Sequence, residues 1–112
     1  MGDRANVLIQ SGDNPGVYLY THWGGYSLPK TVQDALKQKE RWDDEQYLNR
    51  IIFCEMIKGQ KRETTGYGIT AFVCDGEDRI IHIDVDKQQI TLKNHTYSFD
   101  EYIELDLTDI DF

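Results

Sequence analysis

The sequence is organised around Val17-Tyr18-Leu19-Tyr20-Thr21-His22-Trp23-Gly24-Gly25-Tyr26, an aromatic strand that runs straight into a Gly-Gly break. Side chains alternate between the two faces of a strand. One face carries Val17, Leu19 and Thr21, and these small and aliphatic side chains predict that it faces the core. The other face carries Tyr18, Tyr20 and His22, and these rings predict a functional surface.

The two glycines after Trp23 permit positive φ and close backbone approach, so their amides can reach a ligand that a side chain would block. An ordinary tight turn after a hydrophobic strand is the alternative explanation for Gly24 and Gly25. Exposed aromatic and glycine-rich loop residues are functional more often than core residues are. We therefore predict a binding site at this break.

The composition predicts a single folded domain of 112 residues, long enough to bury one core. Its apolar content is 39%, with 12% aromatic residues, which are the types that disordered chains lack. No apolar run approaches the roughly 18 residues of a membrane span, and Met1 to Arg4 contains no apolar signal region. We expect a soluble, cytoplasmic protein with no membrane partner.

The cysteine pattern indicates no cofactor or metal. Only Cys54 and Cys74 occur, each inside an apolar segment and without Cys-x-x-Cys spacing. We predict two buried, reduced thiols and no cofactor.

The net charge of −8 comes from the C-terminal third of the chain. Residues 75–112 carry 11 acidic and 3 basic side chains, which sum to −8, while residues 1–74 carry 9 of each sign. Duplex nucleic acid requires a large basic footprint, and the one tight basic group is Lys58, Lys61 and Arg62. We therefore exclude duplex nucleic acid; the acidic third either meets a basic partner protein or serves solubility.

The first part of the chain predicts a hairpin and two helices. A strand at 6–11 pairs with the central strand through the turn formers of 11–16. Pro29 suits the first turn of one helix, which ends at Arg41-Trp42. Asp43 caps the next helix, and Gly59 ends it.

The remainder predicts three strands and an acidic end. The strands are 69–74, 79–85 and 90–93, joined by hairpins at 75–78 and 86–89. Ser98 and Glu101 form a capping box for a short helix, and an acidic tail begins near residue 105. The fold class is therefore α+β: a two-strand hairpin, two helices, then a three-stranded antiparallel meander, with the helices packed on one face of the sheet.

A second glycine-aromatic turn, Thr65-Gly66-Tyr67-Gly68, precedes the strand that starts at Ile69. If that strand lies beside the central one, both turns converge on one pocket.

Several short motifs follow one another along the chain. They are Tyr18-Leu19-Tyr20-Thr21-His22-Trp23-Gly24-Gly25, Leu28-Pro29, Arg41-Trp42-Asp43-Asp44, Tyr47-Leu48, Arg50-Ile51-Ile52-Phe53 and Thr65-Gly66-Tyr67-Gly68-Ile69. This ordered set, which lies within residues 17–86, resembles a family of small, largely uncharacterised proteins from phages, prophages and bacterial genomes. The resemblance implies no particular activity. It implies a setting in which small proteins block host immunity, some by sequestering nucleotide signals.

The candidate site has the side chains that a small nucleotide requires. Each base stacked on an aromatic face contributes about 1 to 3 kcal/mol, and hydroxyls, glycine amides and arginine receive phosphate oxygens. The candidate ligand-binding residues are Tyr18, Tyr20, Thr21, His22, Trp23, Gly24, Gly25, Tyr26, Arg41, Thr65, Gly66 and Tyr67. The alternative for each aromatic residue is core or sheet-surface filling.

Three functional hypotheses follow, of which the leading one is a non-enzymatic binding protein that sequesters a small nucleotide-type signal. The second is an acidic inhibitor that binds a host defence protein. The third is a small phosphoesterase that uses His22 with the strand face of His82, Asp84 and Asp86, where a metal could bind, although a polar outer face of a meander strand is the commoner explanation of that face. We assign no catalytic residue and leave a homo-oligomer open.

Overall fold

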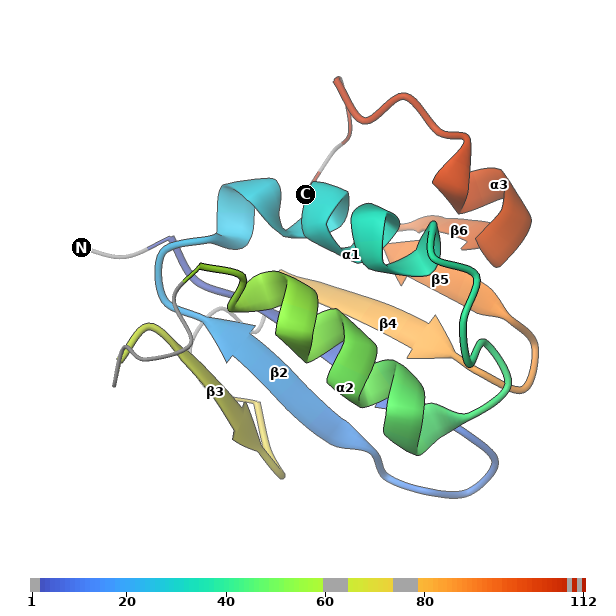
Figure 1. The fold of residues 1–112 in the computed structure, drawn as a ribbon, viewed down its shortest axis with the longest axis horizontal. Helices are drawn as coiled ribbons and strands as arrows, with labels where there is room; N and C mark the ends of the chain where they lie inside the picture. The colour runs from blue at the N-terminus through green and yellow to red at the C-terminus, as the bar shows by residue number, and fades with distance from the viewer. Residues whose placement is uncertain (1–2, 60–64, 74–78, 109, 111) are drawn as a thin grey trace.

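A computed structural model describes residues 3–59, 65–73, 79–108, 110 and 112. The elements in chain order are β1 (Ala5–Gln10), β2 (Val17–Thr21), the 3₁₀ helix η1 (Gly25–Ser27), α1 (Leu28–Leu36), α2 (Glu45–Met56), β3 (Tyr67–Thr70), β4 (Ile80–Asp84), β5 (Gln89–Leu92), β6 (His95–Ser98) and α3 (Phe99–Ile103). The strands form one six-stranded sheet in the order β3-β2-β1-β4-β5-β6 (Figure 1).

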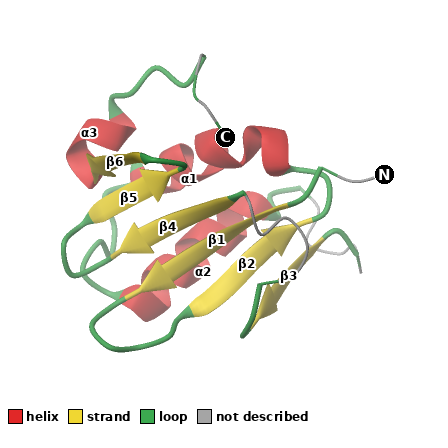
Figure 2. Ribbon diagram, turned by 180° about the vertical axis from the view of Figure 1, so that it is seen from behind, coloured by secondary structure: helices red, strands yellow, loops and turns green. Residues whose placement is uncertain are grey.

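The sheet is mixed, with β1 at its centre. β1 pairs antiparallel with β2 and parallel with β4, so that Ile9 lies between Val17 and Ile83. The core-facing residues of β1, Ala5, Val7 and Ile9, are completely buried. Helices α1 and α2 cover one face of the sheet, and no described helix covers the other face (Figure 2).

The predicted arrangement of the strands is wrong, although the class is α+β. The hairpin of the first two strands is present, since β1 pairs antiparallel with β2, but it belongs to one mixed sheet of six strands and not to a hairpin followed by a three-stranded meander. β3 pairs with β2, and β4 pairs with β1 and β5, so β3 and β4 are not neighbours and no hairpin joins them. The predicted turn at 75–78 lies outside the described residues. The hairpin between β4 and β5 is confirmed, since Asp84 pairs with Gln89.

The starts of the helices follow local capping rules. Pro29 lies in the first turn of α1, as predicted. Asp44, rather than the predicted Asp43, caps α2, where its side chain accepts a 3.1 Å hydrogen bond from the Tyr47 amide. The predicted capping box of Ser98 and Glu101 is confirmed at the start of α3. Among the described helices, none is long and apolar enough to cross a bilayer.

Buried polar contacts fasten the C-terminal segment to α1. Gln33 is 3% exposed, and its Nε2 donates to the carbonyls of Tyr102 at 2.9 Å and Leu105 at 2.7 Å. The buried Tyr102 hydroxyl donates to the Pro29 carbonyl at 2.7 Å, and burial raises the pKa of Tyr102. The apolar residues of the acidic tail pack against the core, namely Leu105, Leu107, Ile110 and Phe112. The described part of the tail therefore belongs to the fold.

The prediction of a buried Cys54 is wrong, because α2 turns this thiol towards solvent. The core-facing side of α2 carries Leu48, Ile52 and Met56. The predicted burial of Cys74 concerns a residue outside those described.

We expect Gln33→Ala to lower the free energy of unfolding by about 1 to 3 kcal/mol, because it removes two side-chain hydrogen bonds, one to the buried Tyr102 carbonyl and one to the part-buried Leu105 carbonyl. Urea denaturation at neutral pH measures this change. The matched control, Gln38→Ala, alters an exposed glutamine of the following segment and should stay within about 0.5 kcal/mol of the wild type. Equal effects of the two substitutions would contradict the role assigned to Gln33.

Candidate functional site

The two glycine-aromatic turns lie side by side, because β2 and β3 are neighbours. Thr21 pairs with Tyr67, and Tyr20 pairs with Gly68. Beyond the strands, the His22 amide donates to the Gly66 carbonyl at 2.8 Å. The strand after the second turn therefore lies beside the central strand, which is the condition under which the two turns converge.

Four rings form a continuous aromatic row around this end of the sheet. The row consists of Tyr20, His22, Trp23 and Tyr67. The ring centroids of successive members lie 5.3, 6.5 and 6.2 Å apart. Tyr20 belongs to the face without described helices, whereas Tyr67 shares the helix-covered face with Thr21. Trp23 connects the two faces and is 51% exposed.

Glycines in β3 and before it make room for these rings. A Cβ atom on Gly66 would lie 2.1 Å from Trp23 Cζ2, and a Cβ on Gly68 would lie 2.5 Å from the Tyr20 ring. Gly66 also has a φ of +99°, a conformation that favours glycine. The Trp23 and Tyr20 rings therefore lie directly against the backbone of Gly66 and Gly68, and any side chain at these two positions would overlap them.

Asp3 ties the Gly-Gly break to the start of β1. Its amide donates to the His22 carbonyl at 2.6 Å, and its carbonyl accepts from the Gly25 amide at 2.8 Å. Its carboxylate accepts from the Tyr26 amide at 2.6 Å and from the Arg79 guanidinium. The hydrogen bond from Arg79 is the main cause that holds the pKa of Asp3 below its usual value. Asp3 therefore holds both His22, before the Gly24-Gly25 break, and Tyr26, after it, by hydrogen bonds.

A small polar cleft opens beside Tyr67. Its volume is about 170 Å³, and its lining includes Thr21, Gly24, Ser27, Thr31 and Lys58. The Thr21 hydroxyl accepts from the Gly24 amide at 2.8 Å, which fixes one wall. The cleft lies at the start of α1, where the Ser27 side chain makes no capping hydrogen bond and the first turn carries no acidic residue. The Leu28 amide already donates to the Gly25 carbonyl and Pro29 has no amide hydrogen, so Lys58 is the charged group of this lining that would attract an anion.

The structure gathers most of the predicted site residues and separates three. The gathered residues are Tyr20, Thr21, His22, Trp23, Gly24, Gly25, Thr65, Gly66 and Tyr67. Tyr18 is two residues further along β2, level with Thr70. Tyr26 is 87% exposed and lines a separate pocket with Arg79 and Phe112. Arg41 lies in the connection between α1 and α2, with its guanidinium over the Tyr47 ring at 4.8 Å.

Sequence reasoning missed Asp3, which fixes this site with both its backbone and its carboxylate. It belongs to no motif and gives no local signal, because its contacts depend on how the strands pair. Lys58 belongs to the basic group that the sequence singles out, whose other members, Lys61 and Arg62, lie outside the described residues.

The structure does not bring His22 and His82 together. His82 is level with Leu8, which is level with Tyr18, four residues along β2 from His22. His82 Nε2 lies 2.7 Å from Gln10 Oε1. Among the described residues, no three His, Cys, Asp or Glu side chains are grouped to hold a metal ion.

A scan against protein-family models and searches of curated proteins and of solved structures find no match to this chain. The function therefore has to be argued from the site itself.

We expect Gly66→Ala to displace Trp23, because the new Cβ would overlap the indole ring. The shift of the Trp23 indole N–H signal in a ¹H–¹⁵N spectrum measures this displacement. Gly59→Ala is the matched control, since Gly59 also has positive φ, +83°, but nothing within 4 Å of a new Cβ. Both variants should lose about 1 kcal/mol of stability from the backbone alone, and only Gly66→Ala should lose more and move the indole signal.

We expect Asp3→Asn to destabilise the protein at neutral pH and to have little effect in acid. The lowered pKa means that the carboxylate stabilises the fold above its unfolded value, near 3.8, and that this contribution disappears as pH falls through the folded value. Urea denaturation of wild type and variant at pH 7 and pH 3 tests the sign. Asp13→Asn, at an exposed turn residue, is the control. A difference between wild type and Asp3→Asn that grows in acid would contradict this account.

Proposed function

We propose that this protein binds and sequesters a small nucleotide-type immune signal, as a phage counter-defence factor in the host cytoplasm. One observation carries the proposal: a half-exposed Trp23 ring stands beside a polar cleft that has a lysine at its rim. The resemblance to small phage and prophage proteins supports the biological setting.

The size of the cleft determines how such a ligand would lie. Binding sites that enclose a whole small molecule usually measure about 300 to 1,000 Å³, whereas this cleft measures about 170 Å³. It has room for a phosphate or a ribose, near Lys58 and the start of α1. The base lies outside the cleft, on the exposed face of Trp23.

The orientation of Trp23 favours stacking. Tyr67 packs edge-on against the indole at 6.2 Å, and Gly66 lies directly beneath it. A ring that is already fixed loses little conformational entropy when a base stacks on it. The row continues to His22 and Tyr20, which offer further aromatic surface.

Both halves of the ligand are needed for useful affinity. A dissociation constant of about 1 μM corresponds to about −8 kcal/mol, while one stacked base contributes only about 1 to 3 kcal/mol. Hydrogen bonds to a charged phosphate add about 1.5 to 3 kcal/mol each. A nucleoside without phosphate should therefore bind too weakly to be sequestered.

The other two hypotheses have less support. A phosphoesterase with His22 and His82 would need these residues close together, and they are separated along the sheet. An inhibitor that acts through the acidic third lacks support of the kind that Trp23 and its cleft give the leading hypothesis, as far as the described residues of that third go. There, Glu101 completes a capping box and Asp106 accepts hydrogen bonds from Thr108, so both acids already have local roles.

We expect Trp23→Ala to abolish nucleotide binding in calorimetry and to leave the melting temperature within a few degrees, because the ring is half exposed. Tyr47→Ala is the matched control, since Tyr47 is also 50% exposed but lies on α2, away from the aromatic row. It should bind nucleotide as the wild type does.

The same experiment distinguishes a binding protein from an enzyme. Chromatography of the nucleotide recovered from denatured protein should show it chemically unchanged. Product in excess over protein would contradict sequestration. Unimpaired binding by Trp23→Ala would contradict the proposed site.

A further inference from the structure

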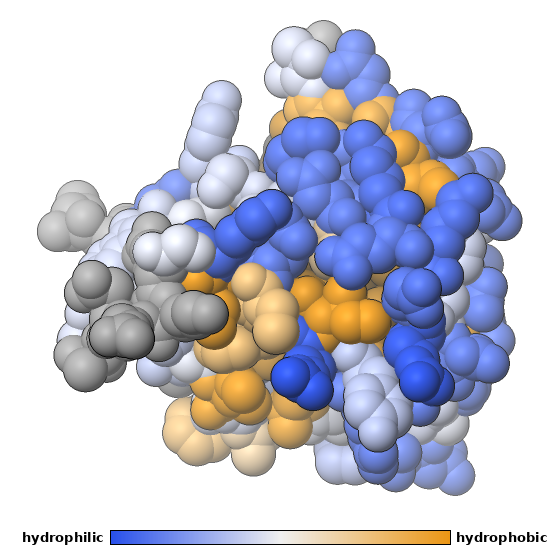
Figure 3. Space-filling view, in the orientation of Figure 1, coloured by the Kyte–Doolittle hydropathy of each residue, from blue (hydrophilic) through white to orange (hydrophobic). Residues whose placement is uncertain are grey.

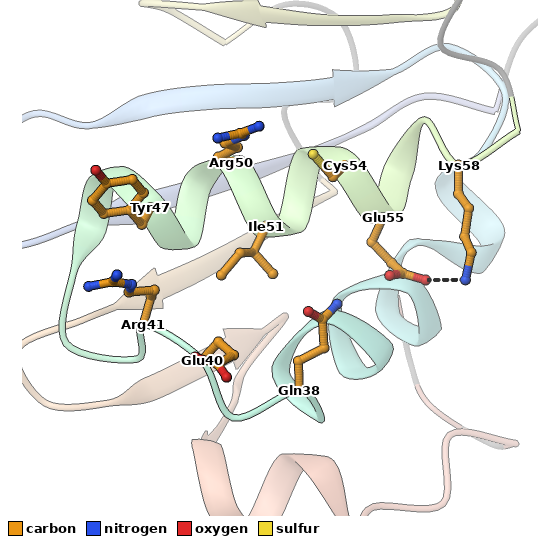
Figure 4. Close-up of a pocket in the computed structure, with 9 residues that line it drawn as sticks. All are labelled: Gln38, Glu40, Arg41, Tyr47, Arg50, Ile51, Cys54, Glu55 and Lys58. Atoms are coloured by element: carbon orange, nitrogen blue, oxygen red, sulfur yellow. Dashed lines mark ion pairs between the residues drawn. The ribbon is translucent and has the colours of Figure 1, made fainter.

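The outer side of α2 carries an apolar groove that shares Lys58 alone with the cleft of the proposed function. Its floor consists of Tyr47, Ile51 and Cys54, of which Tyr47 is 50% exposed and Cys54 is exposed. The groove has a volume of about 460 Å³ and lies between α2 and the segment that follows α1 (Figure 4). Over α2, hydrophobic and strongly hydrophilic surfaces adjoin one another (Figure 3).

The length of the groove favours a helix over a small ligand. From Tyr47 to Glu55 it follows α2 for about 12 Å, at about 1.5 Å per residue. Small ligands are usually buried over about 70 to 90% of their surface, whereas most side chains that line this groove, on α2 and on the segment after α1, are exposed. A second helix laid along α2 would cover the floor over its whole length.

The charge around the groove is opposite to that of the chain. Arg41, Arg50 and Lys58 face Glu40 and Glu55 there, a sum of +1, whereas the whole chain carries −8. Glu55 lies 3.7 Å from Lys58, and its side chain is only 17% exposed. The groove therefore presents more positive than negative charge to a partner.

Arg50 is the cation best placed for an incoming carboxylate. It is exposed and forms no ion pair with any residue that the structure describes. Figure 4 shows Arg50 on one edge of α2 and Glu55 on the opposite edge. Arg41, stacked on Tyr47 at 4.8 Å, provides a second guanidinium at the N-terminal end of the groove.

We propose that this groove docks an acidic amphipathic helix of a partner protein. Apolar residues of that helix, spaced three or four apart, cover Tyr47, Ile51 and Cys54, while its carboxylates pair with Arg50 and Arg41. The inference rests on the α2 face alone and does not depend on nucleotide binding at the aromatic row.

The test uses two designed helical peptides of about 15 residues, with leucines at i, i+4 and i+7 and either glutamates or lysines elsewhere. We expect the acidic peptide to bind and to shift the amide signals of α2 in ¹H–¹⁵N spectra. Arg50→Glu should weaken its binding at least about tenfold and improve binding of the basic peptide. Lys87→Glu, in the exposed turn after β4, changes the net charge equally and should alter affinity less than about twofold.

Three results would overturn the proposal. The first is equal binding of the acidic and basic peptides to the wild type. The second is equal binding of the acidic peptide to wild type and Arg50→Glu, with circular dichroism showing both proteins folded. The third is sedimentation showing that the chain pairs with itself through α2, since a second copy would then be the occupant.

Discussion

The parallel pairing of β1 with β4 determines where the other elements lie. Two parallel neighbours require a crossover between them, and this chain places β2, α1, α2 and β3 between β1 and β4. With β4 on one side of β1 and β2 on the other, β3 joins the outer edge of β2 and β5 joins the outer edge of β4. The helices of the crossover cover one face, which leaves the other without a described helix.

The aromatic row is a product of that topology. Trp23 and Gly66 are far apart in the sequence and meet only because β3 lies beside β2. Asp3 reaches the same break because β1 starts where β2 ends, and Arg79 reaches Asp3 because β4 runs parallel to β1. The contacts that fix the break thus come from three strands, and a change in strand order would dismantle them.

Local features were predictable from sequence, and long-range pairings were not. Pro29 and the Ser98–Glu101 box follow rules that act within one turn of helix, so the starts of α1 and α3 could be read directly, and the cap of α2 was displaced by one residue. The parallel pair could not, because β4 alternates buried and partly exposed residues as a strand of an antiparallel sheet does. β6 was missed because His95 to Ser98 contains few apolar residues. Cys54 was misjudged because apolar residues run continuously from Ile51 to Cys54, which hides the helical period.

The central position of β1 also affects how the chain folds while it is being made. Synthesis proceeds from the N-terminus, so β1 and β2 leave the ribosome first. The second edge of β1 has no partner until Asp84, the last residue of β4, has emerged. At about 5 to 20 residues per second, that interval lasts several seconds. An apolar strand edge that stays unpaired for seconds is a template for aggregation, so the parallel pairing of β1 with β4 closes an exposed edge as well as ordering the sheet.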